Sequence, residues 1–275
     1  MRTVAEWMTR DPVCVTAGAL LSDVARHMTQ RRIRHVPVVA DGAPIGMVTD
    51  DQVARAGSLV GSPPGLWLAS AGAPATARET MEACAAVRAD TPMDDALRLM
   101  RSGHDALVVV DDERRVVGVV TEHDAVRYAY TVVPAGQRIE SLRPVGVLSV
   151  PPDATVAAAL LRMTEHGVRH LCLVGDSGLC GVVSLTLLRG IEPSRSHLTV
   201  DEARVAGPVW SLPADATLDD AVSLMVTHHV GAVPLIDAGR RPVRVVTRSD
   251  VIESVIASLE EEGLFEAVTP SGSWG

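Results

Sequence analysis

The stretch that decides the fold is residues 104–129, HDALVVVDDERRVVGVVTEHDAVRYA. It contains a β-rich run, a polar turn, a second β-rich run, and then a helix that starts near Thr121. Two short apolar runs joined by turn residues predict a β-hairpin, and runs of this length are too short for buried helices. Residues 93–100, MDDALRLM, precede it and place apolar side chains at helical spacing. The whole phrase therefore predicts a helix, a hairpin and a second helix.

The same phrase occurs three more times, at residues 33–56, 168–191 and 230–254. Each copy follows a short helical segment that ends in Met. The hydroxyls that open the second helices lie 72, 63 and 63 residues apart, and they are Thr49, Thr121, Ser184 and Thr247. The longer first interval contains GSLVGSPPGLWLASAGAPA, whose composition is that of a loop. The chain is therefore an array of four repeats.

Each repeat is expected to be a β-α-β-β-α unit, so the predicted fold class is α+β. A unit of three short strands and two helices has too little core to fold alone. Four copies therefore predict two packed pairs, related within each pair by a pseudo-twofold axis. The expected spans are repeat 1 at 1–58, a linker at 59–77, repeat 2 at 78–132, repeat 3 at 133–193, repeat 4 at 194–257, and a C-terminal tail at 258–275.

The composition argues against some classes of partner. The chain has 275 residues, of which 47% are hydrophobic but only 3% aromatic, and its net charge is −9. An acidic chain argues against nucleic acid as the main partner, because phosphate backbones require Lys and Arg surfaces. We find no apolar run long enough for a signal peptide or a membrane span, which favours a cytoplasmic protein with no membrane partner.

The cysteines and histidines do not suggest a metal site. The four cysteines form no CxxC pair. Cys172 and Cys180 could face each other across a hairpin, although buried thiols are the simpler interpretation. The nine histidines are scattered along the chain without zinc-type spacing.

Together the four phrases resemble the CBS domain family, named for cystathionine β-synthase. They leave no segment for a catalytic domain, so the layout is similar to that of a stand-alone protein with four CBS repeats, such as the gamma subunit of the AMP-activated protein kinase. This resemblance implies a regulatory protein rather than an enzyme, with no cofactor. Its regulatory ligand would be AMP, ADP, ATP or S-adenosylmethionine, held in the clefts of each repeat pair.

The resemblance also implies a ribose-binding motif, Gly-h-h-Thr/Ser-x-x-Asp, where h is apolar. An ionised Asp at the start of a helix can accept hydrogen bonds from both ribose hydroxyls. Repeat 2 matches in full, with Thr121 and Asp124. Repeat 4 keeps Thr247 and Asp250 but has Arg244 at the glycine position.

The other two repeats have degenerate motifs. Repeat 1 pairs Thr49 with Gln52, which could still hydrogen-bond a ribose, and repeat 3 pairs Ser184 with Leu187, which could not. A second interpretation applies to every copy. A hydroxyl followed three residues later by an acid or amide is also a capping box, in which both side chains only satisfy helix N–H groups.

Phosphate and base contacts follow from the same resemblance. The odd repeats carry Arg34-His35 and Arg169-His170 just before their second strands, where the gamma subunit places phosphate-facing basic residues. The even repeats have Asp105-Ala106 and Gly231-Ala232 there. The arginines could equally be solvated charges at a strand edge. The expected base cradle comprises Thr9, Pro12, Val13, Cys14 and Val119 near Asp124, and Val145, Val147, Leu148 and Val245 near Asp250.

Three functions are compatible with these observations to different degrees. The favoured one is a nucleotide sensor that signals to an unknown protein target. The alternative is a dimerisation or scaffold module without a ligand, in which the motif residues only cap helices; a homodimer is compatible with either. We find no nucleophile, base or metal set that would support an enzyme.

Overall fold

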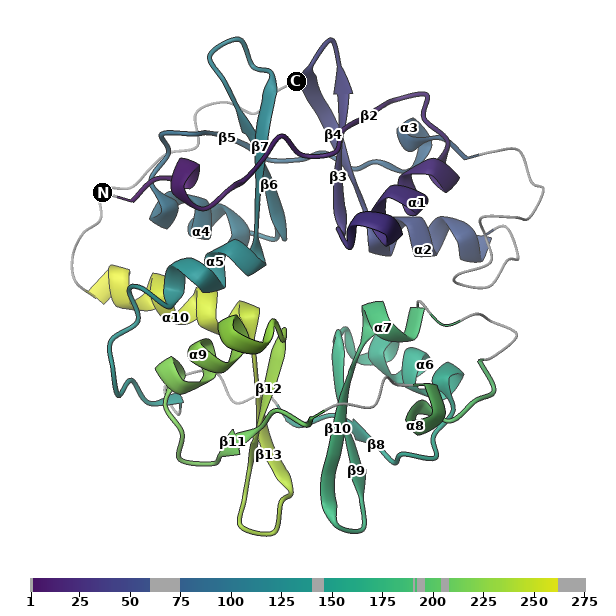
Figure 1. Cartoon of the computed structure of the whole chain (residues 1–275), viewed down its shortest axis with the longest axis vertical. Helices are drawn as coiled ribbons and strands as arrows, with labels where there is room; N and C mark the ends of the chain where they lie inside the picture. Colours follow the sequence, from purple (N-terminus) through teal and green to yellow (C-terminus); the bar gives the residue numbers. More distant parts are fainter. Residues whose placement is uncertain are drawn as a thin grey trace.

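The computed structural model of the protein describes residues 2–59, 75–139, 146–189, 191, 196–203 and 208–261. It confirms the α+β class and the four β-α-β-β-α repeats (Figure 1). Repeat 1 comprises β2 (Val15–Thr16), α1 (Leu21–Arg31), β3 (His35–Ala40), β4 (Ala43–Thr49) and α2 (Asp50–Leu59). Repeat 2 comprises β5 (Ala86–Arg88), α4 (Met93–Arg101), β6 (Ala106–Val110), β7 (Val116–Thr121) and α5 (Glu122–Ala129).

The second half of the chain has the same order of elements. Repeat 3 comprises β8 (Ser149–Val150), α6 (Val156–His166), β9 (His170–Gly175), β10 (Gly178–Ser184) and α7 (Leu185–Arg189). Repeat 4 comprises β11 (Leu212–Pro213), α9 (Leu218–His228), β12 (Ala232–Ile236), β13 (Pro242–Thr247) and α10 (Arg248–Glu261). The last helix thus extends into the segment that we assigned to the tail. Most of the predicted linker and tail lies outside the described residues.

Every repeat builds its sheet in the same way. The first strand runs parallel to the second, which then pairs with the third as an antiparallel hairpin. In repeat 2 the hairpin begins with Ala106 opposite Thr121. The parallel step requires a crossover helix, which α1, α4, α6 and α9 supply.

Within a pair, short segments cross from one repeat to the other. The 3₁₀ turn η1 (Val4–Glu6) and β1 (Thr9–Arg10) precede repeat 1 but pack on repeat 2, where β1 pairs with β7. Helix α3 (Ala77–Thr80) precedes repeat 2 but bonds to repeat 1 through the amide of Ala77 and the carbonyl of Ala19, 2.8 Å apart. Helix α8 (Val200–Ala203) packs on repeat 3 in the same manner. This exchange ties the two repeats of a pair together.

The two pairs meet through two different interfaces. Repeats 2 and 4 share one hydrophobic core, in which α10 packs on α4 and α5 while α5 packs on α9 (Figure 1). The cores of repeats 1 and 3 are separate clusters. Polar contacts between α2 and α7 join these two repeats instead. One side of the molecule is therefore held by apolar burial and the other by ion pairs.

Two smaller predictions can be compared with the structure. Cys172 and Cys180 are both free, and Cys172 is buried opposite Val182 rather than opposite Cys180. Among the described residues, no helix is long and apolar enough to cross a membrane. Phe265 and Trp274, in the predicted tail, lie outside the described part of the chain.

Candidate functional site

A cavity of about 570 Å³ opens between repeats 3 and 4 and reaches the first pair; we call it the central cavity. It brings together several predicted site residues from separate segments. Repeat 4 contributes Thr247, Asp250 and Val245, whereas Leu148 and Arg169 come from repeat 3. Repeats 1 and 2 contribute Arg34, Asp105 and Glu122. Residues from all four repeats therefore line one space.

Asp250 lies in this cavity in a capping geometry. Its Oδ2 accepts hydrogen bonds from the Thr247 amide at 2.7 Å and from the Thr247 hydroxyl at 2.6 Å. Within the described residues, no donor contacts the other oxygen, Oδ1. The carboxylate thus caps α10 with one oxygen, Oδ2. Capping and ligand binding are compatible at this position.

Other charged side chains line the same cavity as Asp250. Arg34, Arg169 and Arg248 contribute positive charge, and Glu122 and Asp105 contribute carboxylates. Burial raises the pKa of Glu122, and the nearby Asp105 raises it further. Burial also raises the pKa of Asp105 itself. Low polarity and like charge disfavour the ionised form of a carboxylate, which is the physical cause of both raised pKa values.

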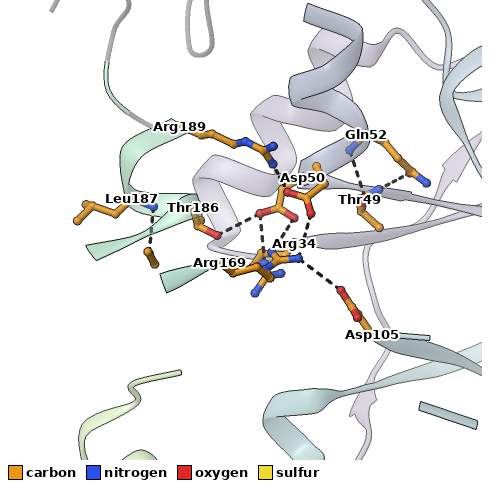
Figure 2. A network of polar contacts seen from close by, with 11 residues as sticks. Arg34, Thr49, Asp50, Gln52, Asp105, Arg169, Thr186, Leu187 and Arg189 are labelled. Carbon is orange, nitrogen blue, oxygen red and sulfur yellow. Dashed lines mark hydrogen bonds and ion pairs between the residues drawn. The ribbon is translucent and has the colours of Figure 1, made fainter. Parts of the chain in front are cut away.

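An ionic network joins this cavity to the interface between repeats 1 and 3 (Figure 2). Arg169 donates to Asp51 Oδ2 at 3.0 Å and to Asp105 Oδ2 at 3.4 Å. Its other terminal nitrogen, Nη2, is buried without a hydrogen bond and lies 3.9 Å from Asp50. Asp50 also pairs with Arg34 at 3.2 Å. Arg169 thus lies at the cavity wall while it holds carboxylates of the first pair.

The two histidines of the predicted basic couples carry no charge near neutral pH. Burial lowers the pKa of His35 to about 4, with Arg34 adding to the effect. Burial also lowers the pKa of His170 to about 4, with help from Arg248 and Arg34. Only the arginine of each couple is therefore cationic at pH 7.

The ribose-binding motif of repeat 2 is complete in sequence, but in the structure its carboxylate is buried. Asp124 is only 4% exposed. Its Oδ2 accepts from the amide and hydroxyl of Thr121, both at 3.0 Å, and Oδ1 accepts from Arg127 at 3.4 Å. Both oxygens are therefore engaged, and the carboxylate presents almost no surface to a ligand.

Only part of the expected base cradle is placed beside the two motifs. Thr9 pairs with Val119 across β1 and β7, and Pro12, Val13 and Cys14 follow in a half-buried segment. In the second pair, Leu148 and Val245 line the central cavity, whereas Val147 does not. Val145 lies outside the described residues.

The two degenerate motifs act as helix caps. Gln52 is buried, and its Oε1 accepts from the Thr49 amide at 2.7 Å. The Ser184 hydroxyl accepts from the Leu187 amide at 3.2 Å.

Ser184 and Leu187 also line a second cavity of about 310 Å³, which we call the outer cleft. Its remaining wall comes from His170, from β10, from Pro208–Trp210 and from residues 229–232. Sequence reasoning missed this role of Trp210 and the role of Arg248 in the central cavity. Both could have been found. Trp210 precedes the first strand of repeat 4, as Leu148 precedes that of repeat 3, and Arg248 directly follows the marker Thr247.

No group of three or more His, Cys, Asp or Glu side chains within the described ranges could hold a metal ion. The central cavity itself combines several kinds of side chain. It supplies a carboxylate acceptor, an apolar patch and guanidinium groups within one space, which suits a ligand with hydroxyls, a ring and an anionic group.

Comparisons with known proteins agree with this arrangement. A family model described as the CBS domain matches residues 4–58, 80–130, 142–190 and 203–257. The uncharacterized protein MJ1404 of Methanocaldococcus jannaschii is 24% identical over 281 residues, which cover 96% of this chain and 64% of that protein. The uncharacterized protein MJ1225 of the same organism is 23% identical over 158 residues, or 53% of this chain and 56% of that protein. The chain thus matches less than two thirds of the length of either relative.

Two crystal structures share the fold. The structure of MJ1225, described as a candidate archaeal homologue of the gamma subunit of AMP-activated protein kinase, superposes with a TM-score of 0.72 at 17% identity. An uncharacterized conserved protein from Pyrococcus horikoshii superposes with a TM-score of 0.65 at 20% identity. Each alignment covers 92% of this chain and 100% of the other.

Proposed function

Because the chain belongs to the CBS domain family, with four CBS repeats in two pairs, we propose that it is a regulatory protein that senses an adenosine nucleotide. The observation that carries the proposal is the meeting of Asp250, Leu148 and Arg169 in the central cavity. These residues supply a ribose acceptor, an apolar base contact and a phosphate-facing cation. AMP, ADP and ATP contain all three complementary groups, whereas S-adenosylmethionine lacks the phosphate.

Each part of the nucleotide would have a distinct partner. Oδ1 of Asp250 would accept from the ribose hydroxyls, and hydrogen bonds to a charged acceptor are the stronger ones. Leu148 and Val245 would contact the base by packing. Arg169 and Arg248, which both line the cavity, would face the phosphate.

The ionic network suggests how a ligand in the central cavity would affect the contacts between the two repeat pairs. Arg169 already holds Asp51 and Asp105 of the first pair. A phosphate beside Arg169 would compete with these carboxylates for the same N–H groups. Binding would therefore weaken the ionic interface between repeats 1 and 3, while the apolar core of repeats 2 and 4 stays intact. A ligand shifts a conformational equilibrium only through such a difference in contacts.

The test is calorimetric titration of the purified protein with AMP, ADP, ATP and S-adenosylmethionine, with Asp250→Ala and Asp124→Ala as matched variants. Hydrogen bonds to charged groups are worth about 1.5–3 kcal/mol, so Asp250→Ala should weaken nucleotide binding by about 10- to 150-fold. Asp124→Ala should leave the affinity of the central cavity within about two-fold, because its carboxylate is closed, and should cost about 1 kcal/mol of stability as a lost cap.

Two results would oppose the proposal. The first is that none of the four ligands binds or raises the melting temperature at millimolar concentration. The second is that both Asp variants change stability alone, by a cap-sized amount. That outcome would favour the scaffold function, in which the repeats only pack and associate. The protein target of the sensor would be sought by comparing partners captured with and without the ligand.

A further inference from the structure

The central cavity contains carboxylates beside the arginines that would face a phosphate. Asp105 and Glu122, both of repeat 2, line the same space as Arg34, Arg169 and Arg248. Neither carboxylate belongs to a ribose motif. Asp105 stands at the position where the odd repeats have Arg34 and Arg169, directly before the second strand. The first pair thus brings negative charge to the part of the cavity where a phosphate needs cations.

The two carboxylates lie close enough to each other to interact. Burial raises the pKa of Glu122, and the negative charge of Asp105 adds to the effect. Both side chains accept hydrogen bonds, as ionised carboxylates do. Asp105 Oδ2 accepts from Arg169 at 3.4 Å (Figure 2), and Glu122 Oε1 accepts from the Ser249 hydroxyl at 3.2 Å. These contacts hold both groups at the cavity wall.

The arginines of the cavity are already balanced in part by carboxylates. Arg34 pairs with Asp50 at 3.2 Å. Arg169 is shared between carboxylates of repeats 1 and 2. Burial lowers the pKa of Arg248, and the charge of Glu122 opposes this shift, which places that carboxylate near the third guanidinium. The positive charge that remains for a ligand is therefore smaller than three arginines alone would supply.

We propose that Asp105 and Glu122 make the central cavity selective for a nucleoside monophosphate over a di- or triphosphate. The proposal rests on the proposed nucleotide function. One phosphate beside Arg169 and Arg248 would gain charge-assisted hydrogen bonds. Every further phosphate brings more negative charge towards the two carboxylates. At an effective dielectric constant of about 20, two like unit charges about 8 Å apart repel strongly enough to weaken binding by more than ten-fold.

A divalent cation would give these carboxylates the opposite role. Mg²⁺ is commonly held by one or two carboxylates together with the phosphates of a nucleotide, and it would then favour ATP. Within the residues that the structure describes, no group of three or more His, Cys, Asp or Glu side chains could hold a metal ion. The contacts of Asp105 and Glu122 are to Arg169 and Ser249 instead. These observations favour repulsion, and the role of Mg²⁺ becomes an outcome of the test.

The experiment is calorimetric titration of the full chain with adenosine, AMP, ADP and ATP in the presence of EDTA. AMP should bind the wild type at least about ten-fold more tightly than ATP. Glu122→Gln keeps the size of the side chain and an acceptor for Ser249. It should strengthen ATP binding by about ten-fold and AMP binding by less, and change adenosine binding by less than about two-fold. Asp105→Asn should act in the same direction.

Glu253→Gln is the matched control, because Glu253 is an exposed glutamate of α10 that does not line the cavity. It should leave the ratio of AMP to ATP affinity unchanged. Equal binding of AMP and ATP by the wild type would overturn the selectivity alone, as would a ratio that neither Glu122→Gln nor Asp105→Asn alters. A second titration with MgCl₂ completes the test. ATP binding that requires Mg²⁺ and is lost in both variants would assign the carboxylates to a metal ion and also overturn the proposal. Failure of all four ligands to bind would overturn the nucleotide function and this selectivity with it.

Discussion

Lowering the pH from 7 to 5 should destabilise the protein, and His170 should account for a defined part of the loss. Burial lowers the pKa of this imidazole to about 4, from an ordinary value near 6.5. An unfolded chain therefore takes up a proton at His170 in the window between these two values, whereas the folded chain does not. The contribution of His170 to stability is fully present above pH 6.5 and is lost as the pH falls towards 4.

The magnitude follows from the two pKa values. Between pH 7 and pH 5 the linkage relation gives a loss of about 2 kcal/mol for one such group. His170 lines two cavities and keeps some contact with water, so we expect about 1–2 kcal/mol. His35, with a pKa of about 4, also lowers the free energy of unfolding as the pH falls. The raised pKa values of Asp105 and Glu122 increase the free energy of unfolding as the pH falls. These three groups are common to the wild type and the variant described next.

The assay is urea unfolding of the wild type and His170→Gln at pH 7 and pH 5. Glutamine stays neutral at both values, so the variant should lose about 1–2 kcal/mol less than the wild type over this range. His166→Gln is the matched control, because His166 is an exposed histidine at the end of α6. If the wild type and His170→Gln lose the same free energy between the two pH values, the reasoning is refuted.

Three further predictions concern how the repeats are joined. Ile256→Ala in α10 removes a fully buried side chain from the core that repeats 2 and 4 share, and should cost about 2–5 kcal/mol in urea unfolding; a loss below 1 kcal/mol would contradict this packing. Gly178→Ala should destabilise the second pair by more than about 1 kcal/mol in thermal unfolding, because φ is +94° and a Cβ atom would lie 2.5 Å from the carbonyl oxygen of Arg240. A double-mutant cycle on Asp51→Ala and Arg189→Ala should give a coupling free energy of about 0.5–1 kcal/mol at low salt that falls in 1 M NaCl, and a coupling of zero would show that this ion pair does not hold repeats 1 and 3 together.

The repeat and its hairpins could be predicted from the sequence because their signals are local. A window of about 35 residues is enough to recognise the pattern of a helical segment, two β-rich runs and a hydroxyl. Each marker hydroxyl does stand directly before a helix, as Thr121 does before α5 and Thr247 before α10. Each of the four copies has too little core to fold alone, so the sequence also predicted that they pack in pairs. The structure contains these pairs.

The sequence could not rank the two motifs that keep the Thr and Asp pair. It favoured Thr121 and Asp124, where the glycine is kept, over Thr247 and Asp250. In the structure Asp124 is buried and fully engaged, whereas Asp250 lines the central cavity. The difference arises from the packing around each helix start, since both carboxylates accept the same two hydrogen bonds from their own threonine.

The sequence by itself determined the repeat, the α+β class and the residue types available at each helix start, because neighbouring residues dictate these features. Tertiary structure alone decided which carboxylate faces a cavity, that burial lowers the pKa of His170, and that Arg169 meets Asp51, 118 residues earlier in the chain. Burial and the meeting of distant charges depend on how the two pairs pack. No local pattern encodes the dielectric surroundings of a side chain, and those surroundings determine its charge and its partners.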